Sequence, residues 1–181
     1  MDSKIKQKFV PFLLVSLSLF FHSCKENKWA DWKVQNQIWL EQKAQEADVK
    51  KTSDGLLYKI IADPTPQDAQ PNITSTIVCD YRVKLINGYV VEYQGSTFGG
   101  IKSATIPLSN TIQGFAEGCH LIHNNGDIEL YIPYWLGYDY QKVIDKEEYE
   151  AEGYGTEGTQ AYIPPYSTLI YEIHICSVTG E

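Results

Sequence analysis

One segment with helical spacing among several with strand-like alternation is the feature that most restricts the fold of this chain. Apolar and polar residues alternate in 75–85, 127–133 and 169–175, which is the pattern of half-buried β-strands. In residues 112–122 the apolar side chains instead recur three, four and seven positions apart, as on one face of an α-helix. Because every segment has one apolar face, the strands are expected to form a sheet that covers this single helix.

Proline and glycine positions mark where these segments end. The Asn-Gly dipeptide at 87–88 predicts a two-residue hairpin loop. The Asn-Gly dipeptide at 125–126 is suited to ending the helix in a left-handed turn. Pro164 and Pro165 predict a stiff extended lead-in to the last strand, because proline cannot donate to a sheet ladder.

Residues 1–23 have the composition of an export signal. Three lysines precede the apolar run at 9–21, which is too short to span a bilayer comfortably. A serine and then Cys24 follow, and a cysteine at this point resembles the lipobox of bacterial lipoproteins. Cys24 is therefore predicted to be lipidated and to become the first residue of the mature chain. An ordinary signal peptide, or an N-terminal anchor in which Cys24 is incidental, is the alternative.

The charge of the mature chain excludes one class of partner. Residues 1–23 contain three of the 15 basic and one of the 23 acidic residues, so their removal leaves a formal charge of −10. An acidic surface argues against binding to nucleic acid and against electrostatic attachment to anionic lipid. Membrane attachment is therefore expected through acyl chains on Cys24.

The remaining cysteines indicate neither a disulfide framework nor a metal site. Cys79, Cys119 and Cys176 are odd in number, and no C-x-x-C or His/Cys cluster has metal-ligand spacing. Cys79 and Cys176 could pair if their strands are neighbours, but buried free thiols are the preferred interpretation. We expect no metal and no cofactor.

The segment between the export signal and the first strand predicts a helix from Asp31 to Ala47, with Asp31 as N-cap. The side chains expected on its inner face are Trp32, Gln35, Trp39 and Gln42, with Ile38 and Leu40 beside them. We expect this helix to lie on the domain as part of a tether, and a partner-binding helix is the alternative.

Residues 139–160 are charged and then glycine-rich. They predict an exposed insertion with one short helix, because so many carboxylates are too costly to bury.

The order of short motifs along 53–179 resembles the FKBP-type peptidyl-prolyl cis-trans isomerase family. The matching stretches are "GLLY" (55–58), "VCDY" (78–81), "NGYVVE" (87–92), "TIQGF" (111–115), "EG" (117–118), "NNG" (124–126), "LYIP" (130–133), "LGYD" (136–139) and "IPPYSTLIY" (163–171). The resemblance implies an α+β fold in which a curved antiparallel β-sheet wraps around one short central α-helix, here with an N-terminal helix added. The expected organisation is a signal peptide at 1–23, a tether and helix at 24–51, and an FKBP-like domain at 52–181.

The resemblance also implies a pocket between sheet and helix. Phe115 would form its floor, where the family has Trp, and Tyr81 and Tyr171 would line its walls. The residues implied to bind substrate are Val91, Thr111, Ile112, Phe115, Tyr162, Ile163 and Tyr171, and those implied to take part in catalysis are Tyr81, Glu92 and Tyr138. An inward-facing aromatic residue on a strand is also an ordinary core residue. A tyrosine that needs a partner for its hydroxyl favours a cavity wall.

Isomerisation of a proline peptide bond requires no nucleophile. The resemblance implies an aromatic pocket that favours the twisted amide, with the Tyr138 hydroxyl bound to a substrate carbonyl oxygen. Glu92 stands where the family has Asp, and Val91 stands where it has Phe. These substitutions, together with Phe115, predict reduced activity.

The implied partners are proline-containing polypeptides, at an extracytoplasmic site on a bacterial membrane, expected to be the outer membrane. The alternatives are a non-catalytic chaperone or binding module on the same fold, and a glycan-binding lipoprotein suggested by 13 Tyr and 4 Trp.

Overall fold

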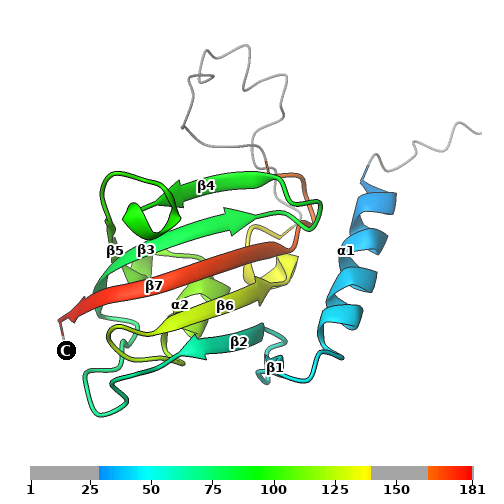
Figure 1. Cartoon of the computed structure of the whole chain (residues 1–181). Helices are drawn as coiled ribbons and strands as arrows, with labels where there is room; N and C mark the ends of the chain where they lie inside the picture. The colour runs from blue at the N-terminus through cyan, green and yellow to red at the C-terminus, as the bar shows by residue number, and fades with distance from the viewer. Residues whose placement is uncertain (1–28, 140–162, 181) are drawn as a thin grey trace, which may run out of the picture.

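The computed structural model describes residues 29–139 and 163–180, which form an antiparallel sheet and two α-helices (Figure 1). The strands are β1 (Lys50–Lys51), β2 (Leu57–Ala62), β3 (Thr76–Lys84), β4 (Val90–Gln94), β5 (Ala104–Pro107), β6 (Asp127–Ile132) and β7 (Leu169–Thr179). The helices are α1 (Ala30–Lys43) and α2 (Gln113–Cys119), and single 3-10 turns are η1 (Ser96–Phe98), η2 (Leu108–Asn110) and η3 (Tyr134–Leu136).

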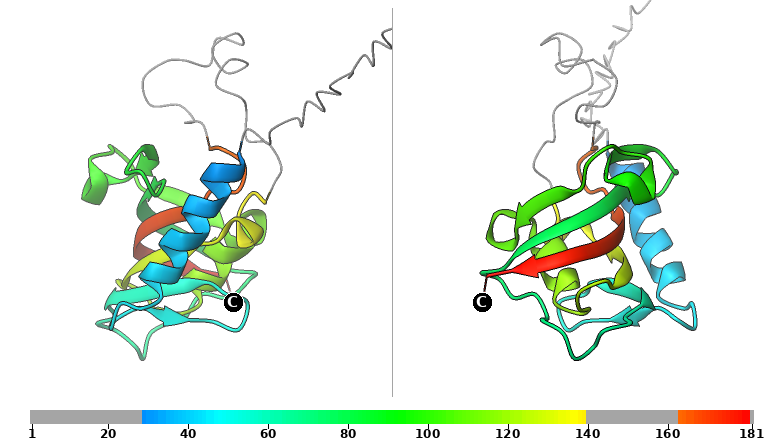
Figure 2. Two further views of the ribbon diagram at one scale, coloured as in Figure 1. Left: turned by 90° about the vertical axis from the view of Figure 1, so that its right-hand side faces the viewer. Right: turned by 60° about the vertical axis from the view of Figure 1, so that its left-hand side comes forward.

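The strands follow the order β1-β2-β6-β7-β3-β4, and β5 pairs with β3 as well. Strand β3 has two partners on one side because its first half pairs with β5 and its second half with β4. The α+β fold with an antiparallel sheet, a short central helix and an N-terminal helix is confirmed. Helix α2 lies against one face of the sheet, and α1 lies beside one end of the strands (Figures 1 and 2).

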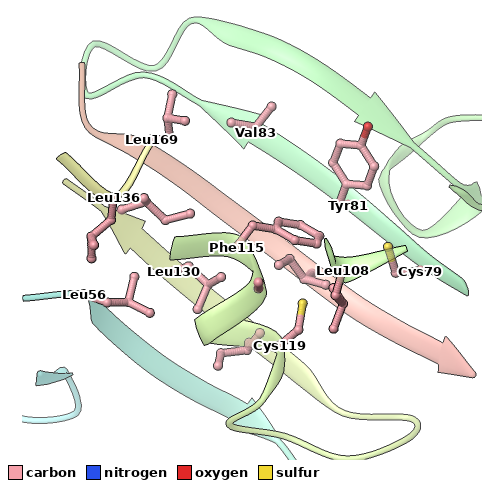
Figure 3. Packing of buried hydrophobic residues seen from close by; sticks show 14 of the residues in the cluster. Leu56, Cys79, Tyr81, Val83, Leu108, Phe115, Cys119, Leu130, Leu136 and Leu169 are labelled. Atoms are coloured by element: carbon pink, nitrogen blue, oxygen red, sulfur yellow. The ribbon is translucent and has the colours of Figure 1, made fainter. Parts of the chain in front are cut away.

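The core lies between the sheet and α2. Ile128, Leu130 and Ile132 of β6 are no more than 1% exposed, as their alternation predicted. Side chains from β3, β7 and α2 meet them, and Figure 3 shows Leu130, Phe115 and Cys119 within this layer. This burial is the main stabilising contribution to the domain.

Two glycines allow α2 to lie close to β6. A Cβ at Gly118 would lie 2.2 Å from Cδ1 of Leu130, and one at Gly114 would lie 2.4 Å from Cγ2 of Ile132. Helix α2 ends at Cys119, earlier than the apolar spacing suggested, and Ile122 is buried in the turns that follow. Apolar spacing continues there because a turn can also direct a side chain into the core.

The predicted hairpin between β3 and β4 is confirmed, but the prediction of a two-residue loop is wrong. Leu85 and Tyr89 pair through a 2.9 Å hydrogen bond, so three residues lie in the loop. Gly88 has φ +84°, whereas Asn87 is not among the described residues with positive φ. A two-residue type I′ loop would need positive φ at both Asn87 and Gly88, and only Gly88 has it.

Helix α1 is shorter than predicted and turns a different face to the domain. It begins after Trp29, so Asp31 lies in the first turn rather than at the N-cap. Asn36 is 1% exposed, whereas Gln35 and Gln42 are exposed and Ile38 is 48% exposed. The inner face is formed by Trp32, Lys33, Asn36, Trp39, Leu40 and Lys43, which are the residues of α1 that are not exposed.

Cys79 and Cys176 are free, and so is Cys119. Cys79 faces the core, and Cys176 lies on the opposite face of the sheet, near Asp80 and Ser103. A register shift in the pairing of β3 with β7, after Val78, accompanies this arrangement.

Cys24, Tyr162 and almost all of the predicted insertion lie outside the described residues. No helix within 29–139 or 163–180 has the length and apolar character needed to cross a membrane.

Candidate functional site

Three aromatic rings meet between the sheet and α2. Tyr81 comes from β3, Tyr171 from β7, and Phe115 from the first turn of α2. The ring centroid of Phe115 lies 6.4 Å from that of Tyr81 and 5.2 Å from that of Tyr171, and both pairs are edge to face. The two tyrosine rings are 6.1 Å apart. Strand parity therefore brings the predicted floor and walls together, and Figure 3 shows Phe115 of α2 on the same side of the sheet as Tyr81.

The hydroxyl of Tyr81 donates a hydrogen bond of 2.7 Å to Oε1 of Glu92. A β-bulge at Val91 makes this possible: Val83 pairs with Glu92 and Lys84 with Val90, which leaves Val91 without a partner. Both Val91 and Glu92 can then face inward, and Val91 is buried in the core cluster. Burial, together with the Glu92 carboxylate, raises the pKa of Tyr81 far above its ordinary value.

Tyr138 follows η3 in a loop that Asp139 closes. Asp139 has φ +57° and donates from its backbone N–H to the carbonyl oxygen of Tyr134 at 2.7 Å. Tyr138 keeps 42% of its surface exposed, and it interacts electrostatically with Tyr81 and Tyr171 of the aromatic cluster. Partial burial, and after it the Glu92 charge, raises the pKa of Tyr138.

Tyr171 belongs electrostatically to the same group of side chains. Burial, followed by neighbouring Tyr138, Tyr81 and Glu92, holds the pKa of Tyr171 well above its usual range. All three phenols therefore stay protonated at neutral pH and keep a hydrogen to donate.

The remaining predicted site residues are placed less uniformly. Ile163 is 6% exposed and belongs to the core cluster, and Ile112 is half-buried against it. Thr111 donates its hydroxyl to the carbonyl oxygen of Leu108 at 2.7 Å. Thr111 also lines a separate shallow hollow of about 470 Å³, together with Asp54, Ile73, Ser109, Glu117 and His120. Its contribution to the aromatic pocket stays a prediction.

The arrangement suits binding of an apolar, uncharged group more than acid–base chemistry. The cluster is aromatic, the Glu92 carboxylate accepts the Tyr81 hydroxyl, and the phenols are neutral. Among residues 29–139 and 163–180, no group of three or more His, Cys, Asp or Glu side chains could hold a metal ion.

Sequence reasoning placed Trp32 on the inner face of the N-terminal helix but missed Asn36 beside it. Asn36 and Trp32 of α1 bind the segment that leads from Ile163 to β7. The signal was the spacing of Trp32, Asn36, Trp39 and Lys43 at positions i, i+4, i+7 and i+11. A polar residue at the centre of that face was not recognised as buried.

Comparison with known proteins agrees with this geometry. Over 134 residues the chain is 32% identical to a probable FKBP-type peptidyl-prolyl cis-trans isomerase of Haemophilus influenzae, covering 74% of this chain and 47% of that protein. It is 29% identical over 140 residues to the FKBP-type 22 kDa peptidyl-prolyl cis-trans isomerase of Escherichia coli, covering 77% and 58%. The chain thus spans about half the length of the curated relatives it matches.

A solved structure shares the fold. The crystal structure of FkpA from Escherichia coli aligns with a TM-score of 0.64 at 28% identity, over 82% of this chain and 60% of that one. The family model for FKBP-type peptidyl-prolyl cis-trans isomerases matches residues 67–176, which contain the three pocket aromatics and Glu92. The chain belongs to the FKBP-type peptidyl-prolyl cis-trans isomerase family.

Proposed function

We propose that this protein catalyses cis-trans isomerisation of proline peptide bonds in polypeptide clients. The observation that carries the proposal is the cluster of Tyr81, Phe115 and Tyr171, with Glu92 holding the Tyr81 hydroxyl. A proline ring is apolar and compact, so it can pack against a surface of aromatic rings. Tyr138, which is partly exposed and whose pKa is raised, would be the neutral donor for a carbonyl oxygen of the bound chain.

Rotation about a peptide bond is slow because resonance is lost as the bond twists, with a barrier of about 18–20 kcal/mol. The twisted amide has less charge separation than the planar one, so a site poor in water favours the twisted form. A hydrogen bond from Tyr138 would fix the substrate carbonyl while the proline ring rests on Phe115. Each factor of ten in rate requires about 1.4 kcal/mol of such preference.

Two substitutions support an activity below that expected for a typical member of the family. Phe115 gives a smaller floor than the Trp that the family's motif has, and Val91 gives a smaller wall than its Phe. Apolar area lost from the pocket weakens binding by about 25 cal/mol per Å². The expected result is an active isomerase with weak affinity for macrolides of the rapamycin type.

A proline-limited refolding assay tests the proposal. The purified chain should accelerate the slow refolding phase of a protein whose native state requires a particular proline isomer. If it gives no acceleration at any concentration, and Val91→Phe combined with Phe115→Trp does not restore any, catalysis is excluded. A non-catalytic chaperone or binding module on this fold would then replace it, and suppression of client aggregation would test that alternative.

We further propose that the clients are exported proteins and that Cys24 is lipidated at the cell envelope. The support is the order of basic residues, apolar run, small residue and cysteine in 1–24. Replacing Cys24→Ala should release the protein from membranes in cell fractionation. Retention of the variant in the membrane would instead indicate an anchor formed by residues 9–21.

A further inference from the structure

Helix α1 contacts two segments that contain predicted site residues. The first segment, 134–139, contains Tyr138, and the second, 163–168, runs from Ile163 to the start of β7. We call these two segments the rim. Figures 1 and 2 show α1 beside the chain that enters β7 and beside the turn after β6. The two rim segments come together at one end of the sheet, where α1 covers them.

Trp32 is connected to the residue after Ile163 by two hydrogen bonds. Its indole Nε1–H donates to Oγ of Ser167 at 2.9 Å, and that hydroxyl donates to the carbonyl oxygen of Pro164 at 2.6 Å. Ser167 is 4% exposed. The Pro164 carbonyl is therefore fixed by a hydroxyl whose own orientation Trp32 determines.

Asn36 holds the end of the same segment. Its Oδ1 accepts the backbone N–H of Thr168 at 2.7 Å, and its Nδ2 donates to the carbonyl oxygen of Trp32 at 2.8 Å. Asn36 is 1% exposed and Thr168 is fully buried. Since the β6–β7 pairing begins only at Leu169, Asn36 supplies a partner for a buried donor that the sheet does not pair. Burial of an amide is costly unless it is bonded in this way.

Lys33 connects the helix to both rim segments. Its ammonium nitrogen lies 4.7 Å from the ring centroid of Tyr166 and 5.5 Å from that of Tyr134. The two rings stack edge to face at 5.3 Å. Tyr166, held at φ +63°, also donates its backbone N–H to the carbonyl oxygen of Asp139 at 3.2 Å. The two rim segments are thus bonded to each other, and Lys33 of α1 contacts both.

We propose that Trp32, Lys33 and Asn36 are positioning residues for the isomerase pocket. They hold the rim so that Ile163 and Tyr138 face a bound proline and its carbonyl oxygen. This inference rests on the proposed function, because it assigns the helix a role in the same reaction. The other half of α1 supplies an internal reference, since Trp39 packs edge to face on Tyr131 of β6 at 5.8 Å.

The matched variants are Trp32→Phe and Trp39→Phe, compared in the full chain purified in detergent. Each exchanges an indole for a smaller ring on the same face of α1, but only the first removes the bond to Ser167. With a short peptide containing one proline, Trp32→Phe should lower kcat/KM threefold to tenfold, mainly through KM, while Trp39→Phe changes it less than twofold. Thermal unfolding of both variants should show that each is folded at the assay temperature.

A double-mutant cycle makes the test specific. Ser167→Ala should lower kcat/KM as Trp32→Phe does. The two changes together should lower kcat/KM little more than one alone, because both break the hydrogen bonds that run from Trp32 through Ser167 to Pro164. Equal losses in Trp32→Phe and Trp39→Phe, no loss in either, or full additivity with Ser167→Ala would overturn the inference.

Amide hydrogen exchange separates this inference from the proposed function. Asn36→Ala should speed exchange of the Thr168 N–H at least tenfold, whereas Trp39→Phe should leave it within a factor of two. If the wild-type chain accelerates no proline isomerisation, the proposed function fails whatever the exchange shows. If the wild-type chain is active and the Thr168 exchange rate is unchanged in Asn36→Ala, the positioning role fails and the proposed function stands.

Discussion

The hydroxyl of Tyr81 and the carboxylate of Glu92 are joined across neighbouring strands by a hydrogen bond of 2.7 Å. The bulge at Val91 turns Glu92 inward, and Glu is long enough to reach the phenol from there. This bond orients the ring of Tyr81 against Phe115. Position 92 therefore retains a carboxylate that accepts the Tyr81 hydroxyl, although it is Glu where the family has Asp.

Removing that phenol should change the stability of the protein at high pH. The folded-state pKa of Tyr81 is raised above the ordinary value of about 10, so the unfolded chain loses this proton first. The contribution to stability is complete below about pH 10 and is lost as the pH rises above it. Tyr81→Phe should lower the free energy of unfolding by about 1–2 kcal/mol at pH 7. It should also flatten the decline above pH 10 in urea denaturation.

Tyr138→Phe should affect catalysis and leave stability nearly unchanged. The side chain is 42% exposed, so loss of its hydroxyl removes little from the core. Loss of one hydrogen bond to the substrate of about 0.5–1.5 kcal/mol corresponds to a rate reduction of roughly twofold to tenfold. Proline-limited refolding and thermal unfolding measure the two effects separately. Tyr93→Phe, at an exposed tyrosine on β4, is the control and should leave both unchanged.

Restoring a larger side chain at the pocket wall should reverse part of the expected loss of activity. Val91 is 9% exposed and Phe115 is 3% exposed, so larger side chains add apolar surface to the wall and floor but also crowd a filled core. Val91→Phe should raise the refolding rate or the macrolide affinity, at a cost in stability of about 1–3 kcal/mol. Val90→Phe is the matched control, since Val90 is 41% exposed. Equal gains from both variants would contradict the role of Val91 in the wall.

Strand parity explains why much of the fold and the meeting of the three aromatic rings could be predicted. Alternation assigns Tyr81 and Tyr171 to the core face without further information, and the apolar face of α2 assigns Phe115 opposite them. The family resemblance adds Glu92, whose inward orientation depends on a bulge that alternation alone would not indicate.

The inner face of α1 could not be predicted in the same way. Gln35 and Asn36 are adjacent amide residues on a polar helix, and periodicity gives no reason to bury one rather than the other. The choice is made by the Thr168 N–H, 132 positions away, which needs a partner at the start of β7. Similarly, the hairpin loop depends on the backbone angle of Asn87, which the dipeptide alone does not determine.

The buried carboxylate of Asp80 should make the protein sensitive to acid. Asp80 is 2% exposed and accepts the backbone N–H of Thr97 at 2.9 Å. Burial acts to raise its pKa, but hydrogen bonds from Ser103 and Thr97 outweigh it and hold the pKa below the ordinary value. The resulting stability is present above about pH 4 and is lost as the pH falls further.

The test is Asp80→Asn, which should cost about 1–3 kcal/mol at pH 7 and flatten the acid dependence of unfolding. Asp68→Asn, at an exposed position, serves as the control and should change neither. An acid profile of Asp80→Asn that parallels wild type would show that other carboxylates determine it.

Close packing of α2 on β6 gives the last prediction. Alanine is the better helix former by about 1 kcal/mol, yet Gly118→Ala should lower the free energy of unfolding by about 1–3 kcal/mol. The added methyl group would lie 2.2 Å from Leu130 Cδ1, and Leu130 is fully buried with little room to move. Gln113→Ala, at an exposed position of the same helix, should not destabilise and isolates the propensity effect.

In Gly118→Ala combined with Leu130→Ala, the new methyl group fills part of the space that Leu130 leaves. The double variant should therefore be more stable than the sum of the single losses implies, as measured by urea denaturation. Strict additivity would mean that the helix shifts away from the sheet, and the contact would then not limit the residue at position 118.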